Sequence, residues 1–240
     1  MEVHSLQEVV IVTSHAPDSP TPVQSAHDTN GRAVTIRRWF LITSPVLAGL
    51  FVIIGAATDP AAGIEGRELY QLYADNPDAL QFHTLGLHWA FAFFGVPALF
   101  VAAYVRGRGA WLANVAAVMG FIGISTLPGL LFIDFYDSAI GELYGADGAV
   151  AVTDKMDSMW GVAAFAAPAA PGLILGFLLA IAALWRAGLV PWWAFAAGLA
   201  GCVALYGSGV RWWGAVAMTV LFTVVAVALA EATRVRTPQP

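Results

Sequence analysis

The sequence has little charge and almost no cysteine. Only 11% of its 240 residues are charged, 59% are hydrophobic, and the mean hydropathy is +0.72. So little charge excludes a soluble globular protein, a disordered chain and a nucleic-acid-binding protein. The single cysteine, Cys202, excludes an internal disulfide framework and a zinc site of paired thiolates. The chain also has no glycine-rich phosphate loop, so we expect no nucleotide cofactor.

The sequence instead contains several long runs of apolar residues. A bilayer core of about 30 Å needs roughly 20 apolar residues per crossing helix, because lipid offers no partners to backbone N–H and C=O groups. The sequence therefore predicts an all-α integral membrane protein, a bundle of six transmembrane helices with both termini cytoplasmic. The six predicted spans are Trp39–Ala57, Phe82–Tyr104, Ala110–Ile133, Trp160–Trp185, Val190–Tyr206 and Val210–Ala230.

These spans divide the chain into three parts. Residues 1–38 are predicted to form a flexible cytoplasmic tail, residues 39–230 the six-span transmembrane domain, and residues 231–240 a second cytoplasmic tail. Outer loops are expected at residues 58–81 and 134–159. The first loop contains a short stretch with apolar residues on one side of a helix, which predicts an amphipathic segment over the helix ends, as a lid or a cover.

The distribution of basic residues predicts the orientation. Of the eleven Lys and Arg residues, eight lie in the pieces that this topology makes cytoplasmic, which agrees with the positive-inside rule. Eleven of the sixteen carboxylates lie in the outer pieces instead. The excess of arginine over lysine and the abundance of alanine are typical of high-GC bacterial coding, so we expect a bacterial cytoplasmic membrane.

Small residues indicate where the helices pack. Gly120 and Gly123 lie in the third span, and Gly172 and Gly176 lie four apart in the fourth. Glycine lets helix backbones approach closely in lipid, so we expect these faces to meet in the bundle interior, with a dimer face as the alternative. Pro168, near the middle of the fourth span, removes a backbone donor and predicts a kink there.

The cores of the six spans contain no Asp, Glu, Lys or Arg, which disfavours a coupled ion transporter. Titratable residues gather at the outer helix ends instead. His83 and His88 begin the second span, Asp134 and Asp137 follow the third, and Asp157 precedes the fourth. The two histidines are five apart and point away from each other on an ideal helix, so only His88 is expected to face the bundle.

Asp134 directly follows an unbroken apolar span and most needs a partner. We expect it to face His88 in the outer third of the bundle, with Asp137 and Asp157 above them. These four residues are the candidate catalytic residues. The candidate substrate-binding residues are aromatic side chains close to them in the sequence: Trp89, Phe132, Tyr136 and Trp160.

Such a site permits several functions. A histidine with two carboxylates could hold a divalent metal that activates water. Without metal, an aspartic acid in apolar surroundings can act as a general acid on a lipophilic, isoprenoid or lipid-like substrate, as a membrane-embedded terpene cyclase or hydrolase would, while aromatic rings stabilise a developing cation. The alternative is a non-catalytic membrane component or a small transporter with an acidic outer face. The expected partner is a membrane lipid or a lipophilic small molecule, and no nucleic acid.

The topology can be tested by cysteine labelling in intact cells. Cysteines introduced at Ala146 and Gly31 are expected to react from opposite sides of the membrane, the first from outside. Labelling of both positions from one side would contradict the six-span count.

Overall fold

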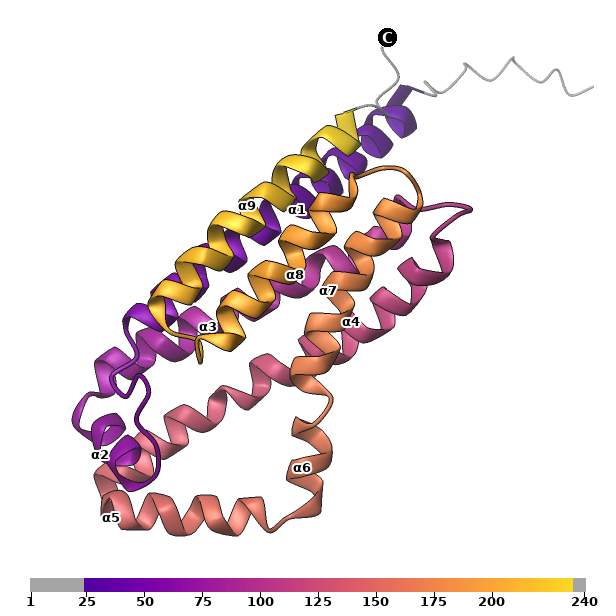
Figure 1. Ribbon diagram of the computed structural model, residues 1–240. Coiled ribbons are helices and arrows are strands. Elements are labelled where there is room, and N and C mark those ends of the chain that lie inside the picture. Colours follow the sequence, from indigo (N-terminus) through magenta and orange to yellow (C-terminus); the bar gives the residue numbers. More distant parts are fainter. Residues whose placement is uncertain (1–23, 235–240) are drawn as a thin grey trace, which may run out of the picture. The chain divides into compact units, whose positions relative to one another are not determined.

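The computed structural model describes residues 24–234, and every regular element in that part of the chain is a helix (Figure 1). The chain divides into two compact units after Thr35, and the bundle described below belongs to the second. The elements are α1 (Gln24–Ala57), α2 (Arg67–Asp75), α3 (Pro77–Phe100), the 3-10 helix η1 (Val101–Ala103), α4 (Ala110–Leu130), α5 (Phe132–Asp157), α6 (Trp160–Ala166), α7 (Ala169–Arg186), α8 (Trp192–Gly207) and α9 (Trp212–Arg234).

Apolar helices long enough to cross a membrane confirm the predicted class, an all-α membrane bundle. By length and composition five such helical segments are found in the described residues: Arg32–Thr58, Pro77–Ala103, Ala110–Asp157, Trp160–Arg186 and Trp212–Thr233. Helix α8 has 16 residues, or about 24 Å at 1.5 Å per residue, less than the bilayer core. The chain is a multi-pass membrane protein, while six crossings and cytoplasmic termini stay predictions.

The ends of the chain contain more helix than the sequence indicated. Helix α1 begins at Gln24, within the predicted tail at residues 1–38. The helix can extend this far because no proline lies between Pro22 and the predicted first span, which starts at Trp39. The rest of that tail, residues 1–23, lies outside the described residues. At the other end α9 continues to Arg234, within the second predicted tail.

Both predicted outer loops are also largely helical. Residues 58–81 contain α2 and the start of α3, and residues 134–159 belong mostly to α5, which bends at Gly145 (φ 77°, ψ 168°). Ala146, next to this bend, is buried at 2% exposure. Tyr144 is 74% exposed and is therefore the better position for the outer label.

Close contact between α4 and α7 confirms that the two glycine faces meet. A Cβ atom at Gly176 would lie 2.6 Å from the backbone nitrogen of Gly120, and one at Gly172 would lie 2.9 Å from that of Gly123. No side chain fits between backbones this close, so glycine at these positions sets the distance between the helices.

Three fully buried phenylalanine rings join α3, α7 and α9. The ring centroids of Phe94 and Phe177 are 4.8 Å apart, those of Phe177 and Phe222 4.7 Å, and those of Phe94 and Phe222 5.3 Å. These distances suit favourable aromatic pairs. The trio therefore fixes three helices from different parts of the sequence around one point of the core.

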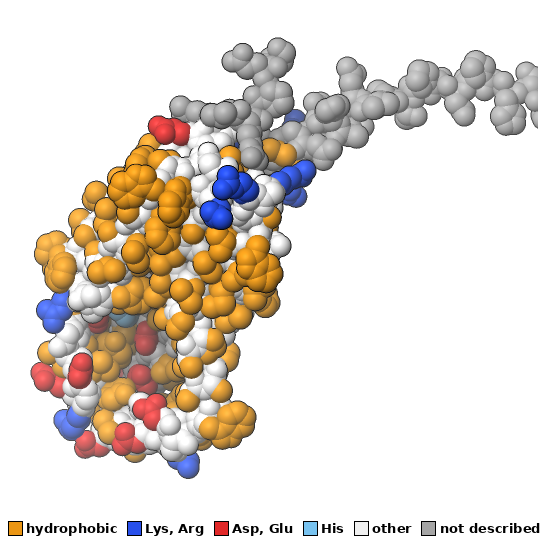
Figure 2. Space-filling view, turned by 45° about the vertical axis from the view of Figure 1, so that its right-hand side comes forward, with side chains coloured by type: hydrophobic (Ala, Val, Ile, Leu, Met, Phe, Trp, Pro, Cys, Tyr) orange, Lys and Arg blue, Asp and Glu red, His pale blue; other side chains and the backbone are white. Residues whose placement is uncertain are grey.

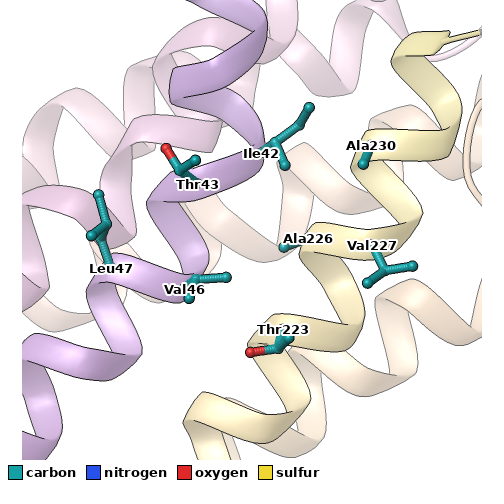
Figure 3. A pocket seen from close by; sticks show the side chains of 8 residues that line it. All are labelled: Ile42, Thr43, Val46, Leu47, Thr223, Ala226, Val227 and Ala230. Carbon is teal, nitrogen blue, oxygen red and sulfur yellow. The ribbon is translucent and has the colours of Figure 1, made fainter.

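Helices α1 and α9 lie side by side and leave an apolar groove between them (Figure 3). The groove has a volume of about 350 Å³ and its eight lining residues include no ionisable side chain. Its two hydroxyl groups are satisfied within their own helices, since Thr43 donates to Trp39 O at 2.8 Å and Thr223 to Thr219 O at 2.8 Å. The residues that line this groove therefore supply no acid or base for catalysis.

The predicted fourth span is divided in two. Helix α6 ends at Ala166 and α7 begins at Ala169, with Pro168 between them. The second half of α5 and then α6 lead the chain away from the bundle and back to it (Figure 1). The break at Pro168, expected from its missing donor, is therefore confirmed.

Two glycine-to-alanine changes in α4 test the helix contact. Gly123→Ala places a methyl group against the backbone of Leu173, whereas nothing lies within 4 Å of a Cβ at Gly129. We expect Gly123→Ala to destabilise the protein by about 1–3 kcal/mol, as overpacking does. Gly129→Ala should leave the thermal unfolding midpoint in detergent unchanged or raise it slightly. Equal midpoints for both variants would contradict the close contact.

Candidate functional site

The polar side chains that could do chemistry gather at one end of the bundle, around α2, the start of α3 and α5. We call this the α2 end. Figure 2 shows acidic side chains around a hollow there, basic side chains at both ends of the bundle, and apolar side chains over the surface between. The functional candidates therefore lie outside the apolar middle of the helices.

His83 is held at the α2 end by a close crossing of α1 and α3. A Cβ at Gly86 would lie 2.6 Å from the backbone nitrogen of Gly55, so the two backbones touch. The His83 ring is 7% exposed, and its Nδ1 lies 2.8 Å from the carbonyl oxygen of Gly55. With Nδ1 protonated, the ring donates this bond and keeps Nε2 as an acceptor.

Asp134 is bound by the residue next to His83. The Thr84 hydroxyl donates to Asp134 Oδ2 at 3.1 Å, and the carboxylate also interacts electrostatically with His83. Thr84 is 1% exposed and Asp134 is half-buried. This pairing supplies the partner that a carboxylate at the end of an apolar span requires.

Asp137 lies one turn further along α5, beneath α2. It is 9% exposed and interacts electrostatically with Asp134. The adjacent Ser138 donates from Oγ to the carbonyl oxygen of Tyr73 at 3.1 Å, which ties α5 to α2. Burial raises the pKa of the Tyr73 phenol well above its usual range, and the nearby carboxylates of Asp134, Asp59 and Asp137 raise it further. We call Tyr73, His83, Thr84, Asp134 and Asp137 the polar cluster.

Helix α2 covers this cluster. Its apolar side chains Leu69 and Leu72 pack with the buried Ala61 and Leu80, which confirms the predicted amphipathic helix. Its backbone also lies against α5, where a Cβ at Gly141 would lie 3.2 Å from Tyr70 O and 2.9 Å from the Ala74 side chain. The exposed ion pair of Arg67 Nε and Asp147 Oδ1, at 2.6 Å, adds little, as exposed pairs do.

Two cavities adjoin the cluster. The α5 cavity, about 290 Å³, lies between the two halves of α5 and is lined by Ile133, Tyr136, Asp137, Ile140, Val152 and Met156. The His88 cavity, about 160 Å³, is lined by Thr84, Leu85, His88, Trp89, Pro128, Leu131, Phe132 and Phe135. Asp137 and Thr84 therefore connect the buried cluster to the two cavities.

His83, not His88, is the histidine beside Asp134, while His88 faces α4. The prediction that His88 pairs with Asp134 and that His83 points away from the bundle was wrong. His88 is half-buried, and its Nδ1 lies 3.3 Å from Pro128 O. The reason is that α3 begins at Pro77, before the predicted start, which places His83 inside a packed helix under α2.

The other predicted residues are spread more widely than expected. Tyr136 lines the α5 cavity, and the Phe132 ring packs edge-on against it at 5.7 Å between centroids. Trp89 lines the smaller cavity and packs edge-on against His88 at 5.3 Å. Asp157 is exposed and Trp160 is 86% exposed, and neither lines the α5 or His88 cavity.

Sequence reasoning did not single out Thr84 or Ser138, and it placed Tyr73 only on the apolar side of the short amphipathic segment. Thr84 and Ser138 directly follow His83 and Asp137, which sequence reasoning had noticed, but a lone hydroxyl beside a titratable residue carries no signal of its own. Within residues 24–234, no group of three or more His, Cys, Asp or Glu side chains could hold a metal ion. No family model, curated protein or solved structure matches this chain.

The raised pKa of Tyr73 predicts a pH dependence of stability. Above the usual phenol pKa of about 10, the unfolded chain loses the Tyr73 proton while the folded protein keeps it, so stability falls as pH rises. We expect Tyr73→Phe to lose less thermal stability than the wild type between about pH 9 and pH 11. Tyr144→Phe, which changes a 74% exposed phenol, is the control and should follow the wild type. A Tyr73→Phe curve parallel to the wild-type curve would contradict burial of this phenol.

Proposed function

We propose that this membrane protein is an enzyme that carries out acid-catalysed chemistry on a lipophilic substrate, with Asp137 as the proton donor. One observation carries the proposal: Asp137 belongs to the buried polar cluster and also lines the α5 cavity. General acids need this combination of partial burial and access to the reacting atoms. The distribution of basic residues supports a site at the outer face of the membrane, and the excess of arginine over lysine with abundant alanine supports a bacterial cytoplasmic membrane.

The lining of the α5 cavity favours a neutral substrate. Ile133, Ile140, Val152 and Met156 supply apolar walls, and the described residues that line the cavity include no cationic side chain. The lining thus offers no positive charge to pair with an anion such as a diphosphate ester. The volume of about 290 Å³ suits part of a linear isoprenoid, as an olefin or an epoxide.

The proposed step is an isomerisation and needs no second substrate. Asp137 protonates a terminal double bond or an epoxide oxygen, and a second double bond of the same molecule attacks the resulting cation to close a ring. The cyclic cation then loses a proton to the Asp137 carboxylate, which restores the acid. The Tyr136 ring lines the cavity and stabilises the positive charge of the intermediate. Thr84 and His83 hold the Asp134 carboxyl group in place next to Asp137.

Turnover of a defined substrate panel tests this proposal. Purified protein in lipid nanodiscs is incubated with linear isoprenoid olefins, their epoxides and the matching diphosphate esters, and products are separated by chromatography and mass spectrometry. We expect a cyclised product from an olefin or an epoxide. Asp137→Asn should lower the rate by about 100-fold or more, as loss of a general acid does.

Two controls separate catalysis from folding. Glu142→Gln changes an exposed carboxylate on the same helix and should leave the rate unchanged. Ser138→Ala removes the hydrogen bond to Tyr73 O and tests whether loosening α2 alone stops the reaction. Turnover by a folded Asp137→Asn variant at the wild-type rate would refute the proposal. Binding of the olefins without any product would favour the alternative, a non-catalytic membrane component.

A further inference from the structure

The end of the bundle opposite α2 has a cavity of its own. It has a volume of about 380 Å³ and is lined by Arg108, Trp185, Arg186, Ala187 and Gly188. Two arginines and a tryptophan thus line one space, and none of the described residues that line it carries a carboxylate. We call this the arginine cavity; it belongs to no part of the proposed reaction.

Local backbone geometry places the two arginines together. Gly109 has a φ of +96°, and a Cβ there would collide with the carbonyl oxygen of Ala183 on α7. Only glycine permits both features, so the connection between α3 and α4 lies directly against the end of α7. Arg108, the preceding residue, is thereby held beside Arg186.

The other wall of the arginine cavity is the carboxyl-terminal end of α7. Leu189 N donates to Leu184 O at 2.9 Å and Gly188, with a φ of +71°, donates to Trp185 O at 2.8 Å. A glycine in the left-handed region commonly ends a helix in this way. A cation at a helix carboxyl terminus is favourable by itself, which accounts for Arg186 but not for Arg108.

We propose that the arginine cavity binds the phosphate of an anionic phospholipid head group. Guanidinium groups bind phosphate oxygens in a bidentate manner, and basic pockets between transmembrane helices suit such head groups. The indoles indicate a lipid rather than a soluble anion. Trp185 lines the cavity at 48% exposure and stacks on Phe195, and Trp111, close to Arg108 in the chain, is 75% exposed. Exposed tryptophans mark the level of lipid head groups.

Lipid binding to the delipidated full-length protein tests this site. The protein in neutral detergent is titrated with phosphatidylglycerol or phosphatidylcholine, and bound lipid is measured by native mass spectrometry. We expect selective binding of phosphatidylglycerol. Binding should weaken about fivefold in Arg108→Gln and about thirtyfold in the Arg108→Gln/Arg186→Gln double variant.

Arg106→Gln is the matched control, because Arg106 is an exposed arginine of the same connection but does not line the cavity. It should bind phosphatidylglycerol as the wild type does. Equal binding of both lipids, or an Arg106→Gln loss as large as that of Arg108→Gln, would overturn the proposal. Binding of inorganic phosphate as tight as that of phosphatidylglycerol would assign the cavity to a soluble anion and would also overturn it. The single Arg108→Gln variant carries the test if the double variant does not fold.

Discussion

Every polar group that lies among lipid must find its partner inside the protein, and the rest of this structure follows from that constraint. Several threonine hydroxyl groups find such a partner within their own helix. Thr126 donates to Ile122 O at 2.6 Å and Thr219 to Ala215 O at 2.7 Å, each within its own helix. These two threonines are thus satisfied without joining helices, whereas the buried hydroxyl of Tyr206 has no hydrogen-bond partner among the described residues. Association of the helices in the apolar middle relies on backbone contact at glycine and on the buried phenylalanine trio.

Polar bonds between helices appear where the helices leave the apolar middle. The ring of His83 contacts the carbonyl oxygen of Gly55, Thr84 binds Asp134, and Ser138 binds the carbonyl oxygen of Tyr73. These bonds join α1, α3, α5 and α2 at one level. Thr84 binds Asp134, and the bond of Ser138 to Tyr73 O holds α2 over Asp137, so structure and proposed chemistry share one set of residues.

The sequence predicted what depends on length and composition, and it failed where tertiary packing decides. Apolar run length identifies membrane helices because bilayer thickness fixes it, and the glycine contact of α4 and α7 followed from spacing alone. Residues 134–159 instead read as a loop, since carboxylates and glycines recur there, yet they fold as most of α5. The prediction of the site was wrong for a related reason. Contact of α2 with α3 and α5 decides which histidine is buried, and no local sequence pattern indicates that contact.

Charged groups at the two ends of the bundle differ in how far they reach into water, because aspartate side chains are short and arginine side chains are long. An aspartate side chain is short, so the half-buried Asp134 depends on the Thr84 hydroxyl beside it, and removal of one partner from a buried charge costs about 3–5 kcal/mol. Arginine extends its charge to water from an apolar surface, so Arg108 and Arg186 remain exposed without such partners. Changes at the arginine cavity therefore alter binding with little effect on the fold. Changes in the polar cluster alter both, which is why only matched variants can separate its chemistry from its contribution to stability.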